Sequence, residues 1–177
     1  LDTDRDGVEQ MAEILNGRTG IDAIHIISHG TPGRLELGNT TLDATSVTGE
    51  HADELAAIRA ALSDEADLLL YGCDVSSTSD GVAFVEALAA ATGAEVAASN
   101  DDTGEAALGG DWVLETVVGG TIETTVITAN QMAGLLTTAA NTGSGAFLAV
   151  AGMTIYSIDI TTGKATPLTT VPTSIGG

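Results

Sequence analysis

The sequence predicts a mixed α/β fold, a three-layer α/β/α arrangement around a mainly parallel sheet, followed by the start of a β-rich segment. Between residues 7 and 99, short apolar runs of strand length alternate with longer segments whose apolar residues recur at helical spacing. Such alternation is typical of a parallel sheet with helices packed on its faces. After residue 100 the pattern changes to polar loops and short paired strand-like runs, which favours β structure.

Each predicted element has a local signal. The expected helices are residues 7–16, 50–62 and 79–92, and the expected buried strands are residues 22–28, 67–72 and 95–99. Gly17 and Gly93 follow the first and third helices, as glycine often does at a helix end. Two hairpins are expected, residues 34–37 with 40–42 around Gly38-Asn39, and residues 111–118 with 121–126 around Gly119-Gly120.

Composition limits the function classes. The chain has 177 residues and is 44% hydrophobic, which suffices for one domain of ordinary size and a small appendage. Its 25 acidic and 5 basic residues give a formal net charge of −20, which repels phosphate backbones and makes a nucleic-acid partner unexpected. The single cysteine excludes an internal disulfide framework and a thiolate zinc cluster.

The domain organisation follows from the change in pattern. We expect an α/β domain over residues 1–138, a linker of small and polar residues over 139–146, and the start of an incomplete β-rich domain over 147–177. Residues 155–163 resemble one repeat unit of bacterial β-propellers. The uncharged run 124–158 is long enough to cross a membrane, but its Asn, Gln, Thr, Gly and Ser content argues against membrane insertion.

The acidic N-terminus admits two interpretations. Asp2, Asp4, Asp6 and Glu13 have the spacing of a calcium-binding loop, with Gly7 at the sharp turn. Alternatively, Asp6 is the N-cap of the helix that follows, which is a common arrangement and the one we favour. No cofactor is required by the chemistry expected below, and calcium is the ion that this pattern admits.

Two reactive side chains follow two neighbouring strands. His29-Gly30 comes after the first predicted strand and Gly72-Cys73 after the second. Right-handed crossovers bring such strand ends to one edge of the sheet, where sites of α/β proteins lie. There His29 could act as base and Cys73 as nucleophile, with backbone N–H groups of Gly30 and Cys73 as the oxyanion hole. A neighbouring imidazolium would lower the pKa of the thiol from its free value of about 8.5.

A non-catalytic interpretation stays open beside this one. A single cysteine after an apolar strand is usually a small buried hydrophobe, and a single histidine is usually a structural residue. His25 lies among apolar neighbours and is expected to be structural, His51 is expected to be exposed at a helix start, and Trp112 is expected to pack against the sheet.

The motifs also carry a resemblance. Ser28-His29-Gly30 and Tyr71-Gly72-Cys73-Asp74, each after an apolar strand, resemble the caspase-like (clan CD) cysteine peptidases. More closely, residues 4–115 are similar to an uncharacterised domain near the N-terminus of giant, acidic, cadherin-like and RTX-type bacterial surface proteins. The matching phrases are residues 5–7, 22–30, 69–75, 97–104 and 108–112.

The resemblance implies a function and a location. His29 and Cys73 would be the catalytic dyad of an endopeptidase that acts on a polypeptide, its own chain included, with Gly30 helping to stabilise the oxyanion. The loop Ser99, Asn100, Asp101 and Asp102 would line the substrate pocket, where its acidic residues would suit a basic side chain. The protein would be extracellular or at the cell surface, as part of a larger secreted adhesin. Relatives have a strand and a helix before the position of Arg5, so the domain is expected to be truncated at its N-terminus. The alternative is a non-catalytic structural or interaction module of the same adhesin.

Overall fold

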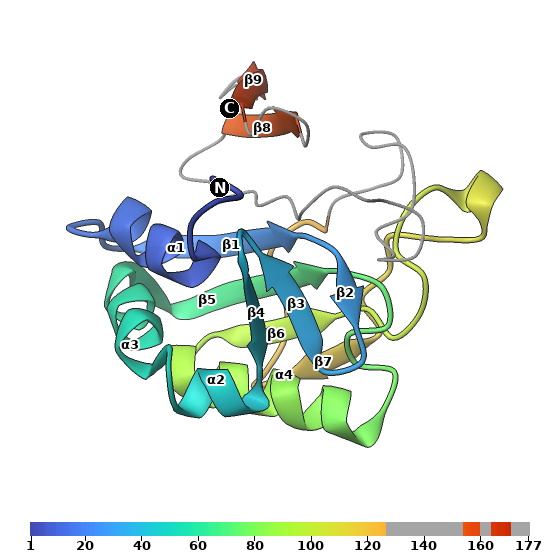
Figure 1. Ribbon diagram of the computed structural model, residues 1–177, viewed down its shortest axis with the longest axis horizontal. Helices are drawn as coiled ribbons and strands as arrows, with labels where there is room; N and C mark the ends of the chain where they lie inside the picture. Colours follow the sequence, from blue (N-terminus) through green and yellow to red (C-terminus); the bar gives the residue numbers. More distant parts are fainter. Residues whose placement is uncertain (127–153, 160–163, 171–177) are drawn as a thin grey trace, which may run out of the picture.

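The computed structural model describes residues 1–126, 154–159 and 164–170. A four-stranded sheet forms the centre of residues 1–126, in the order β1-β5-β6-β7 (Figure 1). β1 (Ile21–Ile27), β5 (Leu62–Tyr71) and β6 (Glu95–Ala98) are parallel, and β7 (Thr116–Val118) is antiparallel to β6. The predicted mixed α/β fold with a mostly parallel sheet is therefore confirmed.

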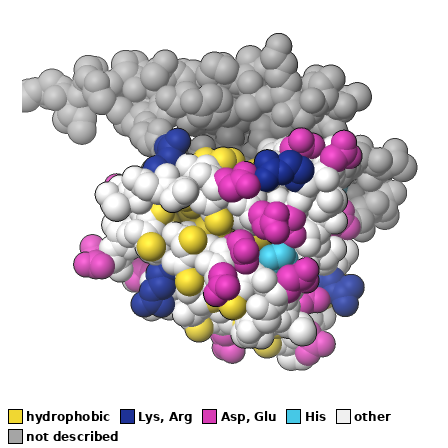
Figure 2. All heavy atoms as spheres, turned by 60° about the vertical axis from the view of Figure 1, so that its left-hand side comes forward, with side chains coloured by type: hydrophobic (Ala, Val, Ile, Leu, Met, Phe, Trp, Pro, Cys, Tyr) yellow, Lys and Arg dark blue, Asp and Glu magenta, His cyan; other side chains and the backbone are white. Residues whose placement is uncertain are grey.

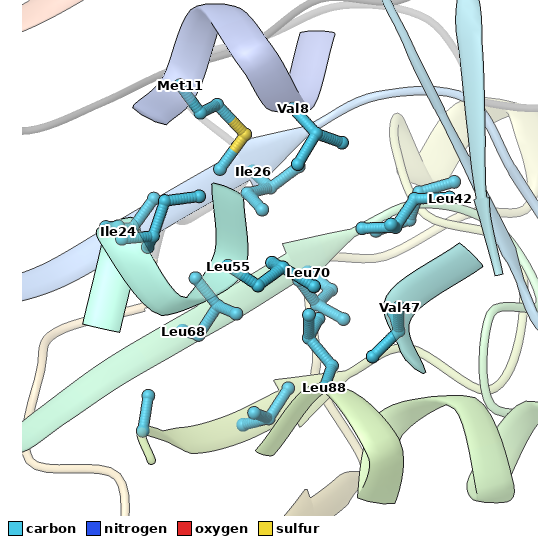
Figure 3. Close-up of a cluster of buried hydrophobic side chains, with 14 of the residues drawn as sticks. Val8, Met11, Ile24, Ile26, Leu42, Val47, Leu55, Leu68, Leu70 and Leu88 are labelled. Atoms are coloured by element: carbon cyan, nitrogen blue, oxygen red, sulfur yellow. The ribbon is translucent and has the colours of Figure 1, made fainter. Parts of the chain in front are cut away.

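The described helices cover one face of this sheet. They are α1 (Gly7–Leu15), α2 (Ala44–Thr48), α3 (Ala52–Ala61) and α4 (Ser79–Thr92). Their buried apolar side chains meet Ile24, Ile26, Leu68 and Leu70 of the sheet in a single core (Figure 3). Within the described residues, the second helical layer of the expected three-layer arrangement is absent, because the other face is covered by the irregular stretch 105–124 instead, which includes the short 3-10 helix η1 (Ala106–Leu108).

The helix ends confirm two local predictions. The Asp6 carboxylate accepts hydrogen bonds from the backbone N–H groups of Val8 and Glu9 at 2.8 and 3.0 Å, so Asp6 is the N-cap of α1. Gly93 ends α4 in the left-handed conformation, with φ of 68°. α2 was not expected from the sequence, and its Asp43–Ser46 capping box explains why five residues suffice to form it.

A small antiparallel sheet extends the helical layer. Its order is β2 (Gly30–Thr31), β3 (Arg34–Leu37) and β4 (Thr40–Asp43), which confirms the first predicted hairpin. Gly38 turns the chain with φ of 63°. Three leucines of this sheet, Leu35, Leu37 and Leu42, join the helical core, so the hairpin is fixed beside the end of β1.

The second face of the sheet has its own core. Trp112 is 5% exposed and packs with Ile27, Leu69 and Tyr71. The His25 ring stacks on the Tyr71 ring with centroids 5.9 Å apart and planes 7° from parallel. The structural roles expected for His25 and Trp112 are confirmed.

Two further expectations were wrong. β7 pairs with β6 rather than with residues 121–126, because the free edge of β6 offers backbone groups that a local hairpin would leave unpaired. The two glycines of the expected turn instead carry the chain closely past Glu95. His51, which was expected to be exposed, is buried, with 2% of its surface exposed. It lies between the start of α3 and Asp6, and its Nε2 atom is 3.7 Å from Asp6 Oδ2.

The C-terminal strands are described by backbone alone. β8 (Thr154–Asp159) and β9 (Lys164–Thr170) form an antiparallel pair, which agrees with the β structure expected over residues 147–177. The expected linker 139–146 and the first residues of the expected β-rich domain, 147–153, lie outside the described residues. A propeller blade needs about four strands, so this pair does not establish one.

Candidate functional site

His29 and Cys73 lie at the ends of two paired strands. In the β1–β5 register Ile27 is opposite Tyr71, and the Ser28 N–H donates to the Tyr71 carbonyl at 3.1 Å. His29 and Cys73 each lie two residues beyond the Ile27–Tyr71 pair, at the carboxyl edge of the sheet. Their exposed fractions are 5% and 1%, so both side chains are buried.

Gly30 shows how closely the segments that follow β1 and β5 approach each other. A Cβ atom at this position would lie 2.8 Å from the Cys73 carbonyl oxygen and 2.9 Å from the Gly72 carbonyl carbon. Only glycine fits such an approach without movement of backbone atoms. The two segments that carry the predicted oxyanion-hole residues are therefore next to each other, although close packing alone also explains this glycine.

A loop encloses the thiol of Cys73. The Thr103 N–H donates to the sulfur at 3.2 Å, and the sulfur lies 3.5 Å from the Thr103 carbonyl oxygen. Asp74, the next residue, has a φ of 60°, a left-handed conformation that is uncommon outside glycine and that bends the chain sharply after β5. The Asp74 N–H donates to the Asp101 carbonyl at 2.8 Å, which fixes this bend to the loop.

The expected pocket residues form this same loop, but they differ in accessibility. Ser99 is fully buried and its hydroxyl donates to the Asp101 carbonyl at 3.1 Å. Asn100 and Asp101 are exposed, and Asp102 is half-buried. Partial desolvation, and then the carboxylates of Glu115 and Asp111, raise the pKa of Asp101. The loop is thus acidic and adjacent to Cys73, with Asn100 and Asp101 at its surface.

The acidic N-terminal residues do not converge. Asp6 caps α1, an Asp2 oxygen accepts from the Asp4 N–H at 3.0 Å, and the Glu13 carboxylate pairs with Arg5 at 2.8 Å. Two other groups of three carboxylates do bring their oxygens within 4.8 Å of one another in the described part of the chain. These groups are Asp67, Glu95 and Glu123, and Asp101, Asp111 and Glu115.

Sequence reasoning missed both carboxylate groups, and only the first had a usable signal. Asp67 is opposite Glu95 in the register of two predicted neighbouring strands, and both point to the same face. A register drawn from the hydrophobic pattern would have exposed this pair.

Acidic side chains also spread over the outer surface. Figure 2 shows the molecule turned so that the left-hand side of Figure 1 comes forward. On this face, Asp and Glu side chains lie around a group of apolar side chains. In the part of the chain that is described, no helix combines the length and the apolar character that a membrane crossing requires.

The comparison with protein families gives a match that spans most of the chain. The model of a domain of unknown function, DUF4347, matches residues 1–136. This chain belongs to the DUF4347 family. Neither the curated proteins nor the solved structures gave a match. The DUF4347 description assigns no chemistry, so the function of this domain is argued below from its own residues.

Proposed function

We propose that this DUF4347 domain is a cysteine endopeptidase of a large secreted bacterial surface protein, with His29 as base and Cys73 as nucleophile. The observation that carries the proposal is the meeting of His29-Gly30 and Gly72-Cys73 at one edge of a parallel sheet. This edge is where α/β proteins build their sites. The caspase-like resemblance of the same residues agrees with it.

The proposed reaction uses groups at this edge. The Cys73 sulfur attacks the scissile carbonyl carbon, and its proton passes to His29. The N–H groups of Gly30 and Cys73 stabilise the oxyanion, and His29 then gives the proton to the leaving amine. A water molecule, deprotonated by His29, hydrolyses the resulting thioester and frees the thiol. The hydrogen bond from Thr103 N–H to the sulfur favours the thiolate that this sequence needs, whereas burial and the contact of the thiol with the Thr103 carbonyl oxygen oppose it.

Two further features support the assignment. Asp74 holds an uncommon left-handed conformation directly after the proposed nucleophile, and strained backbone of this kind concentrates at functional sites. Asn100 and Asp101 are exposed on the loop that bonds the residue after Cys73, and their polar and acidic groups suit a polypeptide substrate with a basic side chain next to the scissile bond. Cleavage of the parent chain itself is one form of this activity.

The burial of Cys73 favours a second candidate function, a non-catalytic module of the same surface protein. With 1% exposure the sulfur is reached by a substrate only if the loop 99–104 moves. A buried cysteine that bonds backbone groups of its neighbour loop also serves as a simple packing residue.

The ionisation of the thiol separates the two functions. We expect the thiolate absorbance of the wild-type protein to titrate well below about 8.5, and to shift upward in a His29→Ala variant. His51→Ala, which removes another buried histidine, is the matched control and is expected to leave the thiol unchanged. Cys73→Ser has no thiol and gives the background absorbance to be subtracted.

An ordinary thiol pKa that is the same in wild type and His29→Ala would reject the peptidase and support the module. The cleavage products of a longer natural chain that contains this domain provide an independent test of the peptidase proposal. Cleavage that persists in Cys73→Ala cannot be the work of this cysteine.

A further inference from the structure

Three carboxylates from three separate segments meet on the second face of the sheet, well away from Cys73. Asp67 belongs to β5, Glu95 begins β6, and Glu123 lies after β7, with one oxygen of each within 4.8 Å of the others. Asp67 precedes Cys73 by six residues on the same stretch of chain, which corresponds to about 20 Å of extended strand. The cluster is therefore separate from the proposed catalytic edge.

Asp67 and Glu95 are direct neighbours across the sheet. They are paired in the parallel register of β5 and β6, so both side chains project from the same face. Like charges directly opposite each other destabilise a sheet. The third carboxylate, Glu123, adds to this repulsion, so the arrangement needs a group of opposite charge.

The burial of Asp67 and of one Glu95 oxygen increases the need for a compensating positive charge. Asp67 is 1% exposed. Its Oδ2 accepts hydrogen bonds from the N–H groups of Glu123 and Thr124 at 3.1 and 2.7 Å, whereas its Oδ1 has no hydrogen-bond partner. The Oε2 atom of Glu95 is also buried and has no partner. A buried carboxylate with no opposite charge beside it is strongly unfavourable, unless a cation or a proton compensates its charge.

Among the described residues no Lys or Arg forms an ion pair with the cluster, and burial lowers the pKa of the nearby His25, which disfavours its charged form. The ion pairs found among the described residues are Arg5 with Glu13 and His51 with Asp6, and neither involves the cluster. An open pocket of about 600 Å³ adjoins Asp67 and Glu123, and the charged side chains that line it are all acidic, Asp22, Asp64 and Glu65 being the others. Desolvation beside the sheet, then the charge of Glu95 and a hydrogen bond with it, and then the charge of Asp67 raise the pKa of Glu123, as expected where carboxyl groups crowd together.

We propose that Asp67, Glu95 and Glu123 bind a divalent cation, with Ca²⁺ preferred. The ligands are all carboxylate oxygens, which hard cations prefer. Ca²⁺ accepts six to eight oxygens in irregular geometry, with carboxylates bound through one or both oxygens and water completing the shell. Mg²⁺ demands a near-ideal octahedron, which three side chains fixed by a sheet and a passing segment suit less well. This site is distinct from the N-terminal loop of Asp2 to Glu13.

The bound ion has a structural consequence. Glu123 follows Ile122, which packs onto the second core of the sheet with Trp112 and Tyr71. A cation shared by β5, β6 and Glu123 joins the covering segment to the sheet. The Gly119-Gly120 pair allows this segment to pass closely against Glu95. Calcium is therefore expected to stabilise the cover of the second face.

The test is calcium binding by the whole chain, freed of metal with EDTA. Titration calorimetry with CaCl₂ is expected to show a site with a Kd of about 0.1–1 mM, as in other partly exposed extracellular sites, and weaker binding of MgCl₂. The melting temperature should rise with calcium, because the ion binds only the folded state.

Four variants assign the site. Glu123→Gln and Glu95→Gln remove one ligand charge each and are expected to weaken calcium binding at least tenfold and to abolish the rise in melting temperature. Glu86→Gln, an equal change at an exposed position of α4, is the matched control and should behave as wild type. Glu13→Gln examines the N-terminal loop and should also behave as wild type.

Several outcomes would overturn the proposal. One is no heat of binding and no change in melting temperature at about 10 mM calcium, well above the weakest site of this class. Others are unaltered binding in both Glu123→Gln and Glu95→Gln, or a loss confined to Glu13→Gln. A rise in melting temperature of Glu123→Gln that is equal with and without calcium would show that the carboxylates share a proton rather than a cation. Glu123 is exposed and Glu95 half-buried, so these variants keep the fold even if Asp67→Asn does not.

Discussion

Gly30, at the start of β2, is the residue of the candidate site where the segment after β5 leaves the least room for a side chain. A methyl group here would meet backbone atoms of Gly72 and Cys73 at 2.9 and 2.8 Å. Because backbone cannot rotate away, we expect Gly30→Ala to reduce the free energy of unfolding by about 1–3 kcal/mol, as overpacking does. Urea denaturation measures the loss.

Gly120→Ala is the matched control for this substitution. Its added methyl group would meet the end of the Glu95 side chain, which can turn aside. With EDTA present, it should cost clearly less than Gly30→Ala. Equal losses would show that the strand ends at Gly30 tolerate expansion and are not held as closely as their backbone distances indicate.

His25 gives the domain a pH dependence of known sign. Burial lowers the pKa of His25, although the nearby Asp67 carboxylate opposes the shift. The unfolded chain therefore binds the proton first, and stability is complete above the ordinary value of about 6.5 and decreases as the pH falls below it towards the lower folded value. His25→Phe keeps a ring against Tyr71 and removes the titrating group.

The measurement is urea denaturation of wild type and His25→Phe on either side of pH 6.5, the ordinary histidine value. We expect the variant to lose less stability on acidification than the wild type. If wild type and His25→Phe lose the same amount of stability on acidification, titrating groups other than His25 determine the acid sensitivity.

At the scale of the single element, α1 depends on its cap. Asp6→Ala removes the acceptor for the Val8 and Glu9 N–H groups, so unfolding should become easier by about 1 kcal/mol. Asp4→Ala removes an exposed carboxylate of the same segment and should cost less than about 0.5 kcal/mol. The midpoint of urea denaturation at constant slope reports both.

The same pair of variants also tests the N-terminal calcium interpretation. A calcium loop built from Asp2, Asp4, Asp6 and Glu13 would make both substitutions equally harmful, and only when calcium is present. Loss in Asp6→Ala alone, with or without calcium, is the signature of the cap.

The elements that the sequence predicted well are those with strong local signals. β1, β5 and β6 are continuous apolar runs, and α1, α3 and α4 have an apolar face with clear ends, so position and type could be predicted. β7 falls within the expected strand 111–118, but its pairing could not be predicted, because its partner β6 is distant in sequence and Gly119-Gly120 imitates a local turn. The burial of His51 likewise depends on Asp6, a partner that no local pattern reveals.

At the scale of the whole molecule, negative charge is the dominant feature. A net charge of −20 on 177 residues repels itself most in the compact state. Raising NaCl from about 0.01 M to about 1 M shortens the Debye length from about 30 Å to about 3 Å. With EDTA present to exclude specific cations, we expect the melting temperature to rise by about 2–4 °C, equivalent to roughly 1 kcal/mol for a chain of this size.

The control for this prediction is KCl at the same concentrations. Simple screening acts equally for both salts. A melting temperature that stays constant or falls as either salt is added would show that self-repulsion does not limit the stability of this fold.

Global topology also decides how much of each site the sequence reveals. His29 and Cys73 could be placed together because both follow parallel strands, and such strand ends share an edge. Asp67, Glu95 and Glu123 could not, because Glu123 reaches the sheet only through the path of an irregular segment. Whether His29 activates Cys73 depends on side-chain chemistry that the titration above examines.

Trp112 has a consequence for every optical experiment on this protein. It is the single tryptophan of the chain, and its ring centroid lies 5.8 Å from that of Tyr71 on the face opposite the helices. Tryptophan emission therefore reports the detachment of the covering segment, whereas far-ultraviolet circular dichroism reports the helices on the other side. A difference in time between these two signals during unfolding would measure directly how independently the two faces of the sheet are held.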